Sequence, residues 1–419
     1  MNVKNAIIQG ENYRFTVLTP SMIRMEYSEK GVFVDKKTQM VVNRTFDVPE
    51  YTVNEKNGEL IIETDKARLV YTGGRFAGNN LRIEQRNQKV IYESTWHYGD
   101  TGHNLKGTTR TLDQANGEIP LQDGLFSMEG WAVISDKGSM LLTEDGWIER
   151  REDIDAEDLY YFGYGTDYLG CLKDYYKLTG ATPILPKYAL GNWWSRYHRY
   201  TETEYRQLVE RFEKEGIPFT TAVIDMDWHL VDDVDPKYGS GWTGYTWNKD
   251  FFPDPKRFLN WLHEHGMKAT LNVHPRDGVR AFEELYPQVA KAMNIDPESG
   301  EAVQFDLTDP KFMEVYFDQL HHPMEEDGVD FWWIDWQQGG LTRQPGLDPL
   351  WGLNHLHYLD SARNDGSDYS ERNPRPLTFS RYAGPGSHRY PIGFSGDTVV
   401  TWESLKFQPE FTACASNIG

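Results

Sequence analysis

An alternation of short apolar runs with amphipathic segments, which begins after Pro186, constrains the fold of this chain most. Each apolar run has the length of a strand, and each following segment spaces its apolar residues as a helix does. This order is typical of βα units and a parallel sheet. Six strands in succession favour a (β/α)8 barrel over a doubly wound sheet. The six are expected at residues 190–197, 219–227, 268–274, 330–335, 377–381 and 392–397.

The expected helices of this region begin with capping signals. One has a threonine three residues before a glutamate, the capping-box arrangement, and two have an aspartate followed by proline at the first helical position. These signals are Thr201 with Glu204, Asp254 with Pro255 and Asp309 with Pro310. A longer insertion, at about residues 276–308, follows the third strand. We therefore expect the barrel over residues 184–419, and we expect it to be incomplete because only six of eight strands precede Gly419.

Residues 1–183 lack this helical periodicity and are expected to form an N-terminal β-sandwich domain. Runs rich in β-branched and aromatic residues, such as residues 13–18 and 67–71, recur between turn signals. Asn57-Gly58 lies between two of these runs, and an Asn-Gly pair supplies the positive φ angles of a type I′ hairpin turn. Short strands at this spacing are typical of sandwiches.

The charge balance excludes polyanionic partners. The 419 residues include 43 Lys+Arg and 64 Asp+Glu, which gives a net charge of −21. This charge argues against nucleic acid and anionic membranes as partners. The first residues lack the apolar segment of a signal peptide, and no run reaches the ~18–20 apolar residues of a membrane span. We expect a cytoplasmic protein, and a monomer and a homo-oligomer are both compatible with this surface.

Acidic residues follow the expected strands. Asp225 and Asp227 follow the second strand, Asp335 the fourth and Asp397 the sixth. In such barrels the active site lies at the carboxyl ends of the strands. An aspartate at a strand end can also cap the next helix. Four aspartates on one rim of the barrel favour an active site instead, because uncompensated like charges are costly to hold together. Two carboxyl groups of opposed character, one ionised and one protonated, are what glycosidic cleavage requires.

Other patterns give no cofactor or metal site. Cys171 and Cys414 are far apart and form no CxxC motif, and the Asp232–Asp235 segment lacks the glycine and the distal glutamate of a calcium loop. No phosphate-binding glycine pattern follows a strand. His274, at the end of the third strand, is a candidate for lining a pocket, although a structural histidine is the simpler interpretation. We expect no metal and no cofactor.

Two segments near the ends of the fourth and sixth strands carry a more specific signal: WIDWQQ at residues 333–338 and GDTVVTWE at residues 396–403. Together with IDMDW at residues 224–228 and FPDP at residues 252–255, they resemble the ordered motifs of glycoside hydrolase family 31, the family of α-glucosidases and α-xylosidases. The resemblance covers almost the whole chain. It implies a β-sandwich followed by a (β/α)8 barrel.

The resemblance also implies a role for each matching residue. Asp335 matches the nucleophile that forms a covalent glycosyl-enzyme, and Asp397 matches the general acid that then serves as the base. In this retaining mechanism the two carboxyl groups stand ~5–5.5 Å apart. Asp225 matches a carboxylate that binds hydroxyl groups of the sugar. Arg381, 16 residues before Asp397, matches the substrate-binding arginine of the family.

Aromatic residues of the sugar subsite match as well, with departures. Trp333 and Phe394 match wall positions, and Trp336 stands where the family has a methionine. The residues after Trp336 are Gln337 and Gln338 instead of Asn and Glu, and a threonine follows the acid/base aspartate where asparagine is usual. No catalytic carboxylate is lost by these departures. They bear on which sugar fits, because wall residues set specificity.

These implied roles predict retaining hydrolysis of terminal α-glycosidic bonds, with an oligosaccharide or another α-glycoside as the partner. An α-glucoside is the first choice of substrate. Three alternatives stay open. The substrate can be an α-xyloside, an α-galactoside or an N-acetyl-α-hexosaminide; the sugar can be transferred to an acceptor instead of water; or the chain can be an inactive carbohydrate-binding fragment because the barrel is incomplete.

Overall fold

The computed structural model describes residues 6–90, 95–415 and 418. The chain divides into two compact units. The first consists of Met1–Thr182, Ala383–Arg389 and Ser395–Gly419, and the second of Pro183–Tyr382 and Tyr390–Phe394. None of the helices in the described part of the chain combines the length and the apolar character that crossing a membrane requires.

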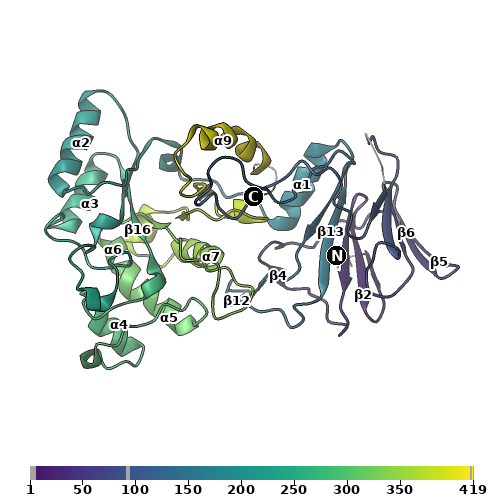
Figure 1. The fold of residues 1–419 in the computed structure, drawn as a ribbon, viewed down its shortest axis with the longest axis horizontal. Coiled ribbons are helices and arrows are strands. Elements are labelled where there is room, and N and C mark those ends of the chain that lie inside the picture. The colour runs from purple at the N-terminus through teal and green to yellow at the C-terminus, as the bar shows by residue number, and fades with distance from the viewer. Residues whose placement is uncertain (1–5, 91–94, 416–417, 419) are drawn as a thin grey trace. The chain divides into compact units, whose positions relative to one another are not determined.

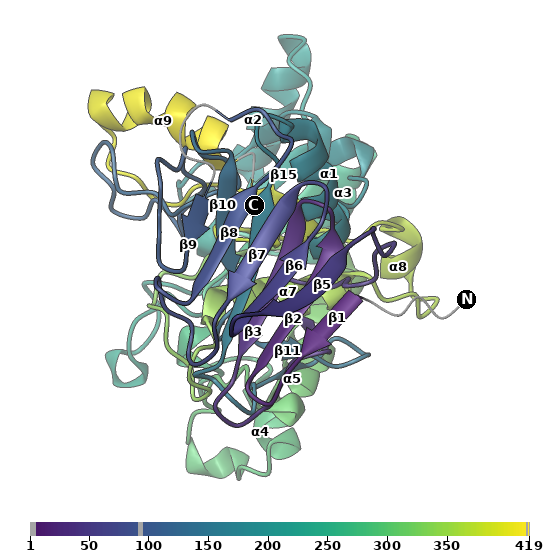
Figure 2. The same ribbon diagram turned by 90° about the vertical axis from the view of Figure 1, so that its right-hand side faces the viewer.

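The first unit is rich in antiparallel sheet (Figure 2). One five-stranded sheet has the order β1 (Ala6–Gln9), β2 (Tyr13–Thr19), β3 (Met22–Tyr27), β13 (Glu157–Gly163) and β10 (Trp131–Ser135). A second has the order β5 (Thr52–Lys56), β6 (Glu59–Glu63), β7 (Ala67–Tyr71), β8 (Leu81–Gln85) and β9 (Thr95–His97). A small sheet joins β12 (Ile148–Glu149), β11 (Leu141–Leu142) and β4 (Lys37–Thr38). The helices α1 (Tyr168–Thr179) and α9 (Trp402–Ala415) complete this unit.

Apolar side chains from both five-stranded sheets form one core in this unit. Phe15 and Ile23 come from the first sheet, and Ile62, Leu69 and Trp96 come from the second; all are buried. A sheet that is apolar on one face gains most by burying that face against another element. The sheet-rich character of the N-terminal region is thus confirmed, and its assignment as a sandwich stays a prediction.

The β5–β6 hairpin has the turn that its sequence predicts. Lys56 pairs with Glu59, so the turn contains two residues, Asn57 and Gly58. Their φ angles are 55° and 81°. Both central residues of a type I′ turn need positive φ, which asparagine tolerates and glycine adopts without steric cost.

The second unit is built on a six-stranded parallel sheet whose strands are neighbours in chain order. The strands are β14 (Trp193–Trp194), β15 (Thr221–Ile224), β16 (Lys268–Val273), β17 (Phe331–Ile334), β18 (Phe379–Ser380) and β19 (Ile392–Gly393). A doubly wound sheet reverses its strand order at a switch point, and this sheet does not. The arrangement fits part of a barrel, while six full βα units stay a prediction.

Helices connect these strands, and Figure 1 shows several of them around β16. They are α2 (Glu202–Lys214), α3 (Pro255–Glu264), α4 (Tyr286–Ala292), α5 (Pro310–Val315), α6 (His322–Asp327), α7 (Pro349–Ser361) and α8 (Asp368–Arg372), with a π-helical segment at Tyr316–His321. The predicted capping box of α2 is confirmed: the Glu204 N–H donates to the Thr201 hydroxyl at 3.2 Å, and the Thr201 N–H donates to Glu204 Oε2 at 2.9 Å. Asp254 and Asp309 cap α3 and α5 as predicted.

Candidate active site

Polar side chains gather where four strands of the second unit end. Asp225 directly follows β15, His274 follows β16, Asp335 follows β17 and Arg381 follows β18. The strands are parallel and adjacent, so their carboxyl ends lie at one edge of the sheet. This edge is where barrel enzymes hold their catalytic residues.

The Asp335 carboxylate is buried and surrounded by groups that stabilise its charged form. Only 6% of the residue is exposed. Its Oδ2 accepts a hydrogen bond from Asn272 Nδ2 at 2.6 Å and lies 3.1 Å from His274 Nε2. The buried Arg381 guanidinium pairs with Oδ1. A guanidinium and an N–H donor both favour the ionised state of a carboxyl group, which is the state a nucleophile needs.

Asp225 is joined to Asp335 through the same amide group. Asn272 Nδ2 donates to Asp225 Oδ1 at 3.0 Å, and the backbone N–H of Met226 donates to the same oxygen at 2.7 Å. Asp225 is half-buried, so its carboxylate is held in place and still reaches solvent. The structure therefore brings Asp225, Asp335 and Arg381 together. The roles given to them stay predictions.

Asp227, the other acidic residue after β15, has a different environment. It is buried, and its Oδ1 lies 3.2 Å from the Arg199 Nε. Arg199 also pairs with Asp232 and lies over the Phe251 ring, 5.9 Å from its centroid. These contacts hold the loop that follows β14, so we interpret Asp227 as a structural ion-pair partner.

Of the predicted aromatic residues, Phe394 lies beside Arg381, and Trp333 packs on Phe394. The rings of Trp333 and Phe394 meet edge to face with centroids 5.5 Å apart, and the Arg381 guanidinium lies 4.7 Å from the centroid of the Phe394 ring. Trp336 is buried, packs on Phe305 at 5.3 Å and donates from Nε1 to the Gly339 carbonyl at 2.8 Å. It lines a hollow of about 390 Å³ together with Arg276, Asp306 and Arg343 among others.

Asp397 belongs to the first unit, whereas the cluster around Asp335 belongs to the second. Its backbone N–H donates to Asp113 Oδ1 at 2.8 Å, and its carbonyl accepts from the Gln114 N–H at 2.8 Å. The residue is exposed. Its role as general acid and base stays a prediction that rests on the motif.

Asn272 is the site residue that the sequence analysis missed, although the sequence contains a signal for it. Successive side chains of a strand point to opposite faces, so residues two apart share a face. Asn272 stands two residues before His274 in a strand whose other residues are mostly apolar. Asparagine is unfavourable inside a strand, and at such a position it indicates a polar partner.

A second cluster of acidic and histidine side chains, His322, Glu325 and Asp360, is an ion-pair network. Arg363 pairs with Glu325 and approaches Asp360 Oδ2 at 3.2 Å. Burial alone would lower the pKa of His322. The 2.9 Å hydrogen bond between His322 and Asp360 helps to raise this pKa above its usual value. Burial raises the pKa of Glu325. The guanidinium and imidazolium charges compensate these carboxylates, so the cluster has no need of a metal ion.

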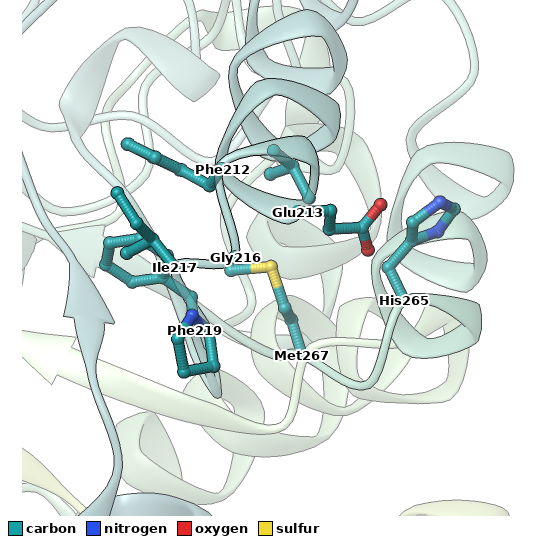
Figure 3. A pocket seen from close by; sticks show the side chains of 9 residues that line it. Phe212, Glu213, Gly216, Ile217, Phe219, His265 and Met267 are labelled. Carbon is teal, nitrogen blue, oxygen red and sulfur yellow. The ribbon is translucent and has the colours of Figure 1, made fainter.

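A further hollow, shown in Figure 3, lies at the opposite ends of the strands. Its walls come from the end of α2 and from the segments that enter β15 and β16. Figure 3 shows Phe212, Ile217 and Phe219 on one side, Glu213 and His265 on the other, and Met267 between them. It has a largely apolar lining and lies at the amino ends of the strands, whereas barrel enzymes hold their active sites at the carboxyl ends.

Comparison of this chain with known proteins identifies the family whose sequence and fold it shares. Residues 182–419 match the model of the glycosyl hydrolases family 31 TIM-barrel domain. An α-xylosidase of Saccharolobus solfataricus is 24% identical over 403 residues, covering 85% of this chain and 51% of the relative. Neutral α-glucosidase C of Mus musculus is 26% identical over 262 residues, covering 56% of this chain and 28% of the relative. The chain thus spans about half, or less, of the length of these relatives.

Solved structures show the same fold. A family 31 dextranase of Flavobacterium johnsoniae, complexed with glucose, superimposes with a TM-score of 0.65 at 17% identity, covering 98% of this chain and 59% of that one. A family 31 α-xylosidase from a soil metagenome, complexed with xylose, has a TM-score of 0.65 at 15% identity, covering 99% and 70%. The family model itself covers more than half of the chain. With its parallel strands in chain order and the matching motifs around Asp335, this chain belongs to glycoside hydrolase family 31.

Proposed function

We propose that this protein is a retaining glycoside hydrolase that cleaves terminal α-glycosidic bonds, with α-glucosides as the preferred substrates. The observation that carries the proposal is the environment of Asp335. Its carboxylate is buried at the carboxyl edge of the sheet, paired with Arg381 and hydrogen-bonded to Asn272. A carboxylate held by a guanidinium and an amide N–H, beside a second carboxylate, Asp225, suits attack on a sugar.

In the proposed reaction, an oxygen of Asp335 bonds to the anomeric carbon while the bond from that carbon to the leaving oxygen breaks. Asp397 gives its proton to the leaving oxygen. Water then attacks the anomeric carbon from the opposite side, Asp397 takes a proton from this water, and the bond to Asp335 breaks. Two inversions leave the product with the configuration of the substrate.

The remaining residues of the cluster supply sugar binding in this proposal. Asp225 is half-buried and its carboxylate accepts hydrogen bonds, a chemistry that suits sugar hydroxyl groups. The rings of Trp333 and Phe394 offer apolar faces against which the C–H groups of a pyranose pack.

A second candidate substrate is an α-xyloside. One relative, matching 85% of this chain, is an α-xylosidase, and a family 31 α-xylosidase complexed with xylose shares the fold. Xylose lacks the hydroxymethyl group of glucose. Aryl α-glucosides and aryl α-xylosides therefore form the first pair of substrates to compare, followed by α-galactosides and N-acetyl-α-hexosaminides.

The test uses the protein encoded by its complete open reading frame. We expect turnover of one aryl α-glycoside in the panel and an initial product with retained α configuration. Asp335→Ala is expected to abolish this turnover. The matched control is Asp327→Asn, which removes a carboxylate on α6 that pairs with Lys256 at 3.0 Å, and which is expected to leave turnover unchanged. Undiminished turnover by Asp335→Ala, or sugar binding by the unaltered protein without turnover of any substrate, would contradict the proposal.

A further inference from the structure

Asn272 holds two carboxylates with one amide group. It lies on β16 with none of its surface exposed. Its Nδ2 donates one hydrogen bond to Asp335 Oδ2 at 2.6 Å and another to Asp225 Oδ1 at 3.0 Å. An amide nitrogen has two hydrogens to donate, so both are used. The orientation of the amide is fixed, because turning its carbonyl toward two carboxylates would set three acceptors against one another.

The other end of the same amide shows that Asn272 is not simply core filling. Among the described residues, no donor reaches its buried Oδ1. A buried acceptor without a hydrogen bond costs stability, and an apolar side chain at this position would avoid that cost. The amide therefore contributes what an apolar residue cannot, which is its two N–H groups.

We propose that Asn272 is a positioning residue that holds the Asp335 nucleophile and Asp225 in one fixed arrangement; this inference rests on the proposed function. Two carboxylates in one buried site repel each other, and each can rotate away about its own side-chain bond. Donation from a single rigid amide offsets that repulsion and sets the direction of each carboxylate. A nucleophile displaced by about 1 Å loses much of its rate.

The test measures how fast Asp335 is labelled. The probe is 5-fluoro-α-D-glucosyl fluoride, or its xylosyl counterpart if the substrate panel selects xylosides, and the adduct is followed by intact-protein mass spectrometry. In this step the bond from Asp335 to the anomeric carbon forms, and fluoride leaves with the electron pair of the bond that breaks. Fluoride needs little help from a general acid, so the rate reports on the nucleophile. Asp335→Ala gives the background.

Three variants separate positioning from packing. Asn272→Leu keeps the branched shape, though in a larger side chain, and removes both donors, and we expect labelling to slow about 10- to 100-fold, the effect of losing a hydrogen bond to a charged group. Asn272→Ser keeps one donor and is expected to fall between this variant and the unaltered protein. The matched control is Thr270→Val: Thr270 is buried on the same face of β16, and among the described residues its hydroxyl has no hydrogen-bond partner.

A fourth variant gives a readout that packing alone would not change. Asn272→Asp is nearly isosteric, and its carboxyl group can donate a hydrogen bond only when it is protonated. The charged and titratable groups around it are Asp225 after β15, His274 after β16, Asp335 after β17 and Arg381 after β18. We expect the optimum pH for labelling to move toward acid in this variant, and to stay unchanged in Asn272→Leu.

The outcomes are distinguishable. Labelling of Asn272→Leu at the unaltered rate would overturn the inference while leaving the proposed function standing. Equal slowing by Asn272→Leu and Thr270→Val would also overturn it, because packing would then explain both. An unaltered protein that turns over no α-glycoside and is not labelled would overturn the proposed function, and the inference with it. Thermal unfolding of each variant verifies that it is folded; if Asn272→Leu is not, Asn272→Ser and Asn272→Asp decide.

Discussion

Replacing Arg381 by methionine should cost far more stability than replacing an exposed arginine. Arg381 is 1% exposed, pairs with the buried Asp335 carboxylate and packs on the Phe394 ring at 4.7 Å. Methionine keeps most of the apolar shape but leaves the carboxylate without its compensating charge. Breaking a buried ion pair in this way costs about 3–5 kcal/mol. In a unit of roughly 200 residues, this corresponds to a fall in Tm of about 6–20 °C.

A double-mutant cycle assigns this cost to the charge. In the D335N background the carboxylate is already neutral, so R381M should lower Tm by less than half as much. The matched control is R343M, because Arg343 pairs with Asp306 at 2.7 Å but is 72% exposed, and exposed pairs contribute only about 0–1 kcal/mol. Thermal unfolding followed by circular dichroism measures all four variants. A cost for R381M no larger than that for R343M, or an equal cost in both backgrounds, would refute the reasoning.

Two further predictions concern titrating groups away from this cluster. Burial lowers the pKa of His229 and of His321 to about 3, whereas in the unfolded chain each binds a proton near pH 6.5. The free energy of unfolding should therefore fall as the pH drops from about 6.5 toward 3, by about 1.4 kcal/mol per pH unit for each histidine. Denaturant titrations at pH 7, 6 and 5 measure this slope, and an unchanged slope in H321Q would contradict the assignment. In the first unit, burial opposes the charged form of Asp158, but Arg24 and Arg151 lower its pKa to about 2. D158N should therefore cost about 3–5 kcal/mol, even in 0.5 M salt, and a loss below ~1 kcal/mol in thermal unfolding would show that the network contributes little.

The gathering of Asp225, Asp335 and Arg381 could be predicted from sequence because it depends on topology alone. Each residue follows a strand, and parallel strands in chain order end at one edge. Asn272 was harder to predict. Its contacts depend on the register between β16 and β17, in which it stands opposite Trp333, and register is set by tertiary packing rather than by periodicity.

The segment around Asp397 shows a different limit of periodicity. The pattern predicts a strand over residues 392–397, but pairing covers only Ile392–Gly393. Gly396 then adopts a φ of +107°, and a Cβ at this position would come within 2.4 Å of the Asp113 carboxylate. A glycine in a strand-like run often marks such a close approach. The motif at Gly396-Asp397 identified the family, and the local conformation followed from a backbone contact that no sequence pattern encodes.

The charge that matters for the proposed reaction is local. The net charge of −21 is spread over the whole chain, whereas the cluster at the strand ends holds two carboxylates and one guanidinium. These three charged groups leave one negative charge in excess at the strand ends. Cleavage of a glycosidic bond develops positive charge on the sugar ring, and a fixed negative charge stabilises it more strongly in a site that excludes water than in bulk water. The amide of Asn272 is uncharged, so it can hold both carboxylates without removing this negative excess.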